Sequence, residues 1–301
     1  MELKIGDVWV GDGHPCYVIA EIGINHNGSL ELAKQLIDVA VDCGAQAVKF
    51  QKRTLEIVYS PEELAKPRES PFGSTNGDLK RALEFGKAQY DEIDAYCKGR
   101  GIHWFASAWD VPSLEFIEQY APPAHKVASA LVTHADLLRA VRETARPVIM
   151  STGMSTLEEI DQALEIAGTQ KMVLLHCTST YPARPHELNL KCIQTLRERY
   201  GLLVGYSGHE VGLYPSALAA GLGACVIERH ITLDRAMWGS DQAASIEPQG
   251  LQRLIRDIRE TPVVMGTGEK VVYEAERAVR EKLRRYSDGG RREEDIKPVR
   301  V

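Results

Sequence analysis

The chain has 301 residues, of which 44% are hydrophobic, so it is long enough to bury a substantial core. Its formal net charge of −6 disfavours a polyanionic partner such as nucleic acid. It has no run of about 18 apolar residues, no secretory signal, and six scattered cysteines without a CxxC pair, so we expect a cytoplasmic protein that makes no use of a membrane.

Short apolar runs alternate with amphipathic segments from residue 16 onward. Continuous apolar runs between helices are typical of parallel strands that are covered on both faces. Eight such units fit the roughly 250 residues of a (β/α)8 barrel, and a doubly wound open sheet is the alternative. The eight predicted strands are 16–23, 45–51, 102–107, 124–129, 146–151, 171–177, 202–207 and 224–229.

Helix signals separate these strands. Apolar residues at helical spacing predict a helix that begins after Ser29 and ends at Gly44. Ser155 and Glu158 predict a capping box at the start of the helix after the fifth strand. The last helix of the barrel is expected to begin at Pro248.

Three pieces lie outside the predicted barrel. Residues 4–11 resemble a small hairpin that could plug the barrel floor. Residues 53–86 form a long polar insertion after the second strand, and loops of that length next to a barrel mouth are often functional, so we expect a lid. We expect one domain over residues 1–285 and a charged tail over residues 286–301.

Polar side chains end nearly every predicted strand, which is where (β/α)8 enzymes carry their chemistry. A single buried serine or histidine at such a position is usually structural, but a whole ring is harder to explain in that way. Side-chain alternation places Lys49 and Gln51 on one face of their strand. The ring contains Glu21, Lys49, Gln51, Ser107, Lys126, Ser129, Ser151, His176, Ser207, His209, Glu228 and His230.

Two histidines of this ring are candidate metal ligands. His209 and His230 close the seventh and eighth strands, which are neighbours in a barrel. Two neutral imidazoles with an oxygen ligand and water suit Mn²⁺, Zn²⁺ or Fe²⁺. The sequence therefore predicts a metal pair at the mouth.

Two lysines of the ring need a negatively charged partner if they are buried. One interpretation is an ion pair of Lys49 or Lys126 with Glu21 or Glu228, and the other is a bound anion. The segment STGMST (151–156) supports the anion, because it enters a helix whose free N–H groups can hold a phosphate. More hydroxyls come from the segments HCTSTYP (176–182) and GYSGHE (205–210). A phosphorylated carboxylic acid would suit this set.

Seven motifs follow one another at the predicted strand ends and in the loops after them. They are EIGINHNG (21–28), VKFQ (48–51), KVAS (126–129), STGM (151–154), HCTSTYP (176–182), GYSGHE (205–210) and ERHITLDRAMWGSDQAASIEP (228–248). Together they resemble the sialic acid synthase family, which includes the bacterial N-acetylneuraminate synthases, and the resemblance covers residues 3–285. It implies a transferase that forms a C–C bond between phosphoenolpyruvate and an open-chain aldose, releasing phosphate and a 2-keto-3-deoxy nonulosonic acid.

The resemblance also implies roles for individual residues and a divalent metal, with Mn²⁺ expected ahead of Mg²⁺ or Co²⁺. His209 and His230 match the metal ligands. Residues at phosphoenolpyruvate-binding positions are Lys49, Lys126, Ser129, Ser151 and Ser207. Residues at acid or sugar-facing positions are Glu21, Gln51, Tyr181 and Asp241, and Ser107 and Ser179 add substrate-facing hydroxyls. Small-molecule substrates are the expected partners, and a homodimer is a possible oligomeric state.

Departures from the family pattern leave the aldose open. The sequence ends without the antifreeze-like domain that family members usually carry, and Leu131, Ala108 and Ser179 replace polar residues common in the family. N-acylmannosamine, mannose, its 6-phosphate and the precursors of legionaminic or pseudaminic acid all remain candidates, as does a Kdn synthase. Two other hypotheses are a Schiff-base pyruvate aldolase that uses Lys126 and a barrel that only binds an anionic sugar.

Overall fold

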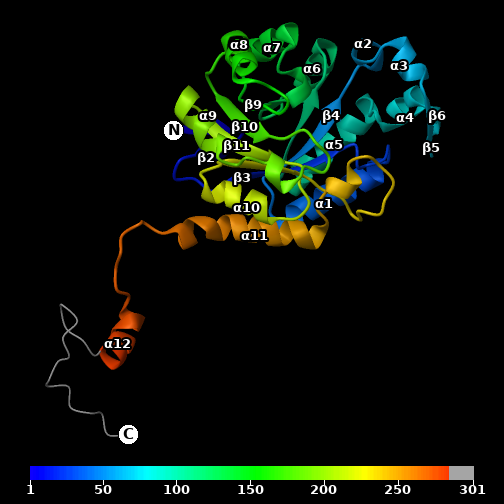
Figure 1. Cartoon of the computed structure of the whole chain (residues 1–301). Coiled ribbons are helices and arrows are strands. Elements are labelled where there is room, and N and C mark those ends of the chain that lie inside the picture. The colour runs from blue at the N-terminus through cyan, green and yellow to red at the C-terminus, as the bar shows by residue number, and fades with distance from the viewer. Residues whose placement is uncertain (285–301) are drawn as a thin grey trace, which may run out of the picture. The chain divides into compact units, whose positions relative to one another are not determined.

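The computed structural model describes residues 1–284, and its main unit, Met1–Val263, is a closed barrel of eight parallel strands surrounded by helices (Figure 1). The strands pair in chain order, and the last closes onto the first. Each strand lies within two residues of its predicted bounds, so the barrel is confirmed and the open sheet is wrong. The strands are β3 (Tyr17–Gly23), β4 (Ala47–Lys52), β7 (His103–Ala108), β8 (His125–Val127), β9 (Val148–Ser151), β10 (Met172–Cys177), β11 (Leu203–Gly208) and β12 (Val226–His230).

The strands are apolar along most of their length because their two faces belong to two different hydrophobic cores. Inward residues such as Ile19, Phe105 and Leu175 fill the barrel itself. Alternate residues such as Val18 and Val48 pack outward against the helices. The helices that follow the strands are α1 (Leu30–Cys43), α5 (Lys87–Arg100), α6 (Val111–Glu118), α7 (Ala135–Glu143), α8 (Leu157–Ala167), α9 (Cys192–Tyr200), α10 (Tyr214–Gly221) and α11 (Pro248–Met265).

One of two detailed helix-cap predictions is confirmed. Ser29 caps α1, and Gly44 ends it with a φ of 85° that favours glycine. The capping box of α8 is one residue later than predicted: Thr156 and Glu159 form it, rather than Ser155 and Glu158. The shift arises because the Ser155 hydroxyl donates to Gly153 O at 3.3 Å, inside the preceding turn.

The N-terminal hairpin is confirmed. It consists of β1 (Glu2–Ile5) and β2 (Val8–Gly11), which pair antiparallel. Ile5 and Val10 are fully buried and belong to the core inside the barrel. Asp7 Oδ1 lies 2.8 Å from Nε2 of His103, at the start of β7, so the hairpin closes the end of the barrel opposite the strand carboxyl ends.

The insertion after β4 has its own secondary structure (Figure 1). At its base, Thr54 N donates to Asp110 Oδ2 at 2.7 Å. At its tip, Phe72 makes an edge-to-face contact with Trp238, with ring centroids 5.7 Å apart, on the loop after β12. The insertion therefore touches the rim of the mouth, and lid movement stays a prediction. Its elements are α2 (Leu55–Val58), α3 (Pro61–Ala65), β5 (Pro67–Ser70), β6 (Gly73–Thr75) and α4 (Asn76–Leu83).

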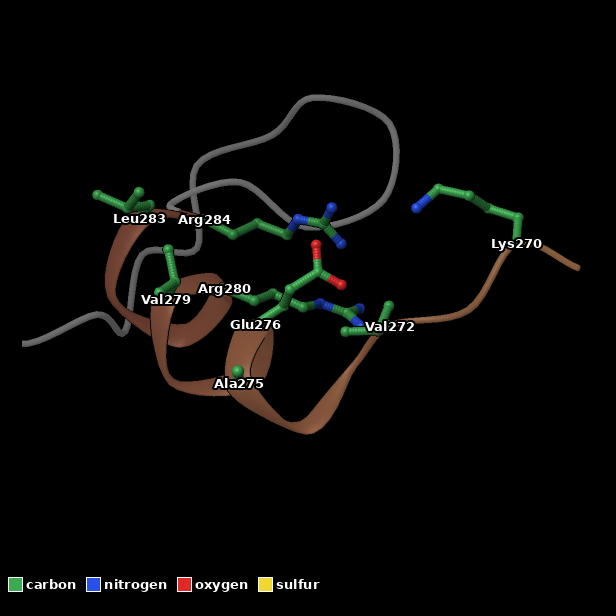
Figure 2. Close-up of a pocket in the computed structure, with 8 residues that line it drawn as sticks. All are labelled: Lys270, Val272, Ala275, Glu276, Val279, Arg280, Leu283 and Arg284. Carbon is green, nitrogen blue, oxygen red and sulfur yellow. The ribbon is translucent and has the colours of Figure 1, made fainter. Parts of the chain in front are cut away.

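A second unit begins at Val264 and contains α12 (Glu274–Leu283). Figure 2 shows a hollow beside this helix that is lined by charged side chains such as Glu276 and Arg280 together with apolar ones, and none of the predicted site residues lies there. None of the helices within residues 1–284 is long and apolar enough to cross a membrane. The predicted tail, 286–301, lies outside the described residues, and the predicted domain boundary stays a prediction.

Candidate active site

The strand register gathers the predicted polar ring at one end of the barrel. Glu21 on β3 lies opposite His230 on one neighbouring strand and opposite Lys49 on the other. Further around the barrel, Ser107 on β7 lies opposite Lys126 on β8. Because all eight strands are parallel, these carboxyl-terminal residues share one mouth, as the sequence predicted.

Four charged side chains form the centre of this mouth, and all four are buried. Lys49 Nζ lies 3.0 Å from Glu21 Oε2 and 3.3 Å from Glu228 Oε1. Lys126 Nζ lies 3.8 Å from the same Glu228 oxygen. The ion pairs considered from the sequence therefore exist, and two ammonium groups balance two carboxylates in a place from which water is largely excluded.

Burial and neighbouring charges give these groups different protonation behaviour. Burial, opposed by the charge of Lys49, raises the pKa of Glu21 to about 7. Burial acts the same way on Glu228, but the charges of Lys126 and Lys49 outweigh it and lower the pKa of Glu228 to about 2. Burial lowers the pKa of Lys126 to about 8. Near neutral pH, Glu228 is thus a permanent counter-ion, whereas Glu21 can gain or lose a proton.

Three predicted serines bond directly to this charged cluster. Ser107 and Ser151 each accept a hydrogen bond from a lysine Nζ, at 3.2 Å and 2.6 Å. Ser207 Oγ donates to Glu228 Oε1 at 3.1 Å. Since a hydroxyl has one donor and two acceptor sites, Ser107 and Ser151 each fix an ammonium group and still have an O–H to donate to a substrate oxygen, whereas the O–H of Ser207 is already used on Glu228.

Two further serines meet at the loop after β9. Gly153 N donates to Ser129 Oγ at 3.0 Å, and a Cβ at Gly153 would lie 2.9 Å from that oxygen and collide with Ser179 Oγ. Glycine is therefore required for the two hydroxyls to approach here. The start of α8 is less open than the sequence suggested, because Glu159 Oε2 accepts from Thr156 N at 2.8 Å and already places an anion there.

The two predicted metal ligands are adjacent, with ring centroids 5.5 Å apart. His209 Nδ1 lies 2.8 Å from Thr178 O, which can only accept, so His209 donates from Nδ1 and its Nε2 is free to bind a metal. His230 Nδ1 is buried and has no hydrogen-bond partner in the described part of the chain. Tyr181 covers the pair, with its ring centroid 4.1 Å from that of His209.

These histidines fit a metal that takes its other ligands from water or substrate. Within residues 1–284, no group of three or more His, Cys, Asp or Glu side chains is arranged to hold a metal ion. Two imidazoles supply two ligands, and an octahedral ion would then keep several positions open for oxygen. The two imidazoles lie together at the mouth, while metal binding and the identity of the metal stay predictions.

The side chains around Glu21 approach one another closely. Gln51 Nε2 donates to Glu21 Oε1 at 3.2 Å. Gly23 has a φ of 53°, and a Cβ there would lie 3.0 Å from Glu21 Oε1 and 3.3 Å from His230 Cε1. Glycine thus keeps side-chain bulk away from the point where a carboxylate, an amide and a candidate metal ligand converge.

Asp241 lies on the loop between β12 and α11, near the same end of the mouth. Asn25 anchors this loop, since its Nδ2 donates to Ile231 O at 2.9 Å and to Ser245 Oγ at 2.7 Å. Burial lowers the pKa of His230, and the negative charge of Asp241 opposes that shift, so the carboxylate lies within electrostatic reach of the histidine.

Comparison with known proteins identifies this architecture. The sequence profile of the NeuB family matches residues 36–270, which is well over half of the chain. The chain belongs to the NeuB family. It is 39% identical over 280 residues to the N-acetylneuraminate-9-phosphate synthase of Homo sapiens, in an alignment that covers 91% of this chain and 78% of that protein.

Two more NeuB-like proteins extend the comparison. The chain is 36% identical over 285 residues to the N,N'-diacetyllegionaminic acid synthase of Legionella pneumophila, covering 91% of this chain and 80% of that one. A crystal structure of N-acetylneuraminic acid (sialic acid) synthetase from Leptospira borgpetersenii, in complex with citrate, superposes with a TM-score of 0.82 at 31% identity. That superposition covers 95% of this chain and 98% of the other.

One residue of the predicted ring lies outside this NeuB site, and two residues contribute more than the sequence indicated. His176 faces the helices rather than the mouth, and its Nε2 donates to Leu188 O at 2.6 Å. Its neighbour Cys177 faces inward, with Sγ 3.8 Å from His209 Nδ1. Glu228 was considered only as one of two possible ion-pair partners of the lysines, although side-chain alternation already put it on the same face as His230.

Behind the two histidines lies a buried ion pair that sequence reasoning missed. Arg229 Nη1 lies 2.9 Å from Glu210 Oε1, and its Nη2 donates to Glu210 O at 2.6 Å. Because Glu210 follows His209 and Arg229 precedes His230, the pair ties together the strand ends that present the two imidazoles. The sequence held a signal for this pair. In the dipeptides His209–Glu210 and Arg229–His230, side-chain alternation places the charged residue on the face opposite the histidine.

We expect Arg229→Met to lower the free energy of unfolding by about 3–5 kcal/mol, because it leaves the Glu210 carboxylate buried without a counter-ion. Equilibrium urea unfolding measures the change. The control is Arg199→Met, which breaks an exposed pair with Asp161 and should cost about 0–1 kcal/mol. The double variant Arg229→Met with Glu210→Met should regain much of the loss, and a double variant as unstable as the single one would contradict this account.

Proposed function

We propose that this chain catalyses the condensation of phosphoenolpyruvate with an open-chain mannosamine- or mannose-type aldose, giving a 2-keto-3-deoxy nonulosonic acid and phosphate. The observation that carries the proposal is a pair of buried lysines, Lys49 and Lys126, beside two histidines at one barrel mouth. The names of the relatives, which are synthases of acids of this kind, support it. The reaction can be tested by phosphate release from phosphoenolpyruvate with a panel of aldoses.

Lys49 and Lys126 are proposed to bind the phosphate and carboxylate of phosphoenolpyruvate. Their hydrogen-bonded serines, Ser107 and Ser151, hold the ammonium groups toward the mouth. Ser129 and Ser207 are proposed to lie around the same anion, Ser129 beside the loop after β9 and Ser207 through its bond to Glu228. Charge-assisted bonds of this kind are strong because both partners are ionised and water is excluded.

A divalent metal, with Mn²⁺ as our first choice, is proposed to bind His209 and His230. The charge balance supports it: two lysines already face two carboxylates, so an incoming substrate with several negative charges needs further positive charge. When bound, such an ion would polarise the aldehyde oxygen as a Lewis acid. Tyr181 over the histidines would limit the access of water to that place.

Glu21 is proposed to act as the general base that accepts a proton from water in the second half of the reaction. The enol carbon of phosphoenolpyruvate forms the new bond to the aldehyde carbon, whose oxygen takes up a proton, and positive charge is left at C2. Water adds there and gives up one proton, and the resulting C2 hydroxyl loses the other as the C–O bond to phosphate breaks and the ketone forms. Glu21 has a pKa of about 7 and lies at the mouth between Lys49 and Gln51, so it can accept that proton near neutral pH.

Gln51 and Asp241 are proposed to bind the hydroxyls of the aldose. Gln51 touches Glu21, and Asp241 approaches from the loop after β12, so an acceptor between them would place its aldehyde toward the histidines. A legionaminic- or pseudaminic-type product is the alternative within the same chemistry.

The proposed place of the reaction is the cytoplasm. All six cysteines are free thiols, which supports a reducing compartment.

Metal binding can be measured without turnover. Titration calorimetry with Mn²⁺ should show one site in the chelator-treated protein, and His230→Ala should weaken it at least about tenfold because one of two imidazole ligands is lost. His176→Ala is the matched control, since that strand-end histidine faces the helices and should leave the affinity unchanged. Activity that survives complete removal of metal would refute the assignment.

Phosphoenolpyruvate affinity should fall about tenfold or more in Lys126→Ala, because a charge-assisted contact contributes roughly 1.5–3 kcal/mol. Calorimetry with phosphoenolpyruvate measures the change, and Lys171→Ala, at an exposed lysine just before β10, is the control.

A trapping experiment tests for a Schiff base with pyruvate. Treatment with borohydride in the presence of pyruvate should leave the mass of the chain unchanged. An adduct that depends on Lys126 would instead favour a Schiff-base aldolase.

The pH profile should report on Glu21. Its carboxyl must lose a proton to act as a base, and its pKa is raised to about 7, so kcat/KM should rise as the pH increases from about 6 to 8. Glu21→Gln should lower kcat by about a hundredfold and remove this rising limb. A Glu21→Gln enzyme with the wild-type pH profile would show that another group is the base.

A further inference from the structure

Arg53 is a cation at the base of the insertion that the proposed reaction does not use. It follows β4 directly, and its side chain is only 10% exposed. It pairs with Glu84 rather than with the glutamates of the central cluster. Covering an arginine in this way costs free energy unless its donors are used, so its contacts indicate what it does.

Two neighbouring elements hold Arg53 in place. Its guanidinium carbon lies 4.4 Å from the ring centroid of Trp109, which follows β7. On the other side, Nη1 lies 3.9 Å from Glu84 Oε2, and the backbone N of Arg53 donates to Glu84 Oε1 at 2.9 Å. Glu84 follows α4, the last helix of the insertion. The folded insertion therefore takes part in fixing the position of this arginine.

Arg53 also meets the amide of Gln51, and this contact decides which way the amide points. Arg53 Nη2 donates to Gln51 Oε1. Because a guanidinium group has donors and no acceptor, it must face the oxygen of the amide and not its amino group. The amino group then faces the active site, where Gln51 Nε2 donates to Glu21 Oε1 at 3.2 Å.

The main chain of Gln51 is fixed, but its amide has two possible orientations. Tyr90 Oη donates to Gln51 O at 3.0 Å, and β4 pairs with a strand on each side. The last torsion of a glutamine side chain is nevertheless broad, and half a turn exchanges the oxygen with the amino group. That rotation would aim the amide oxygen at the Glu21 carboxylate, which repels it. Arg53 therefore favours the orientation that supports Glu21.

We propose that Arg53 is a positioning residue that holds the Gln51 amide with its amino group toward Glu21, so that Gln51 meets the acceptor as a hydrogen-bond donor. This inference rests on the proposed function, in which Glu21 is the base and Gln51 binds an aldose hydroxyl. An amino group has two N–H bonds, so one remains for the acceptor when the other is given to Glu21. The acceptor must then offer an oxygen lone pair at this place.

A double-mutant cycle tests whether Arg53 acts through Gln51. Arg53→Met removes every donor and still fills space beside Trp109, and it should lower kcat about tenfold, as expected for the loss of one charge-assisted hydrogen bond. The affinity for phosphoenolpyruvate, measured by calorimetry, should not change. In a Gln51→Ala background, Arg53→Met should alter kcat by less than about twofold, because the group on which Arg53 acts is gone.

Two further variants control the cycle. Arg53→Lys should recover part of the lost activity, since an ammonium group can still donate to Gln51 Oε1. Arg81→Met removes an exposed charge from α4 and should leave kcat unchanged. Full activity of Arg53→Met would overturn the inference, and so would an equal loss with and without Gln51. If Arg53→Met does not fold, the same cycle with Arg53→Lys decides the question.

A measurement without turnover separates this inference from the proposed reaction. In protein labelled with ¹⁵N at glutamine side chains, the signals missing from Gln51→Ala identify the Gln51 amino group. Its protons should exchange with solvent at least about tenfold faster in Arg53→Met than in the wild type or in Arg81→Met, because the bond to Glu21 is no longer held. This result would support the positioning role even if no aldose is turned over, which would refute the proposed reaction alone. Turnover by the wild type with unchanged proton exchange in Arg53→Met would refute the positioning role alone.

Discussion

The site depends on keeping two ammonium groups and two carboxylates buried side by side at the barrel mouth. Removing any one of them would leave an uncompensated charge in a poorly hydrated place, which costs several kcal/mol. Glu228 resolves this constraint by serving both lysines through a single oxygen. Glu21 is then the group whose charge can change, because burial opposes its ionisation more than Lys49 favours it. The same cluster that is proposed to bind a multiply charged anion therefore contains one carboxyl group, Glu21, that can be neutral.

The barrel supplies the rigidity that this arrangement needs. Parallel register fixes which strand ends are neighbours, and the hairpin formed by β1 and β2 closes the other end with Ile5 and Val10. Outside the strands, the pair of Arg229 and Glu210 fixes the ends of β11 and β12 from behind. The two imidazoles are therefore positioned by groups that never face a substrate. Such support is what keeps a reactive geometry within a fraction of an ångström.

The sequence predicted the strands and the polar ring because both depend on local patterns. Apolar runs, cap residues and alternation are visible in one dimension, and they located all eight strands. His176 lies outside the mouth, where its Nε2 bonds to Leu188 O, because a continuous apolar run does not show which face of β10 turns inward. The insertion was expected as a polar loop, since two of its three helices have only four and five residues and are too short to show periodicity. The contacts of Arg53 and Glu210 join segments whose approach requires the complete fold.

The reaction and the choice of acceptor are built on different parts of the molecule. The groups assigned to phosphoenolpyruvate and the metal lie on strand ends, where register and core packing leave little freedom. The groups assigned to the acceptor are Gln51, at the end of β4 just before the insertion, and Asp241, on the loop after β12. Loops tolerate substitution far better than barrel strands do. This division explains how relatives at 36–39% identity can carry the names of synthases for different acids while sharing one barrel.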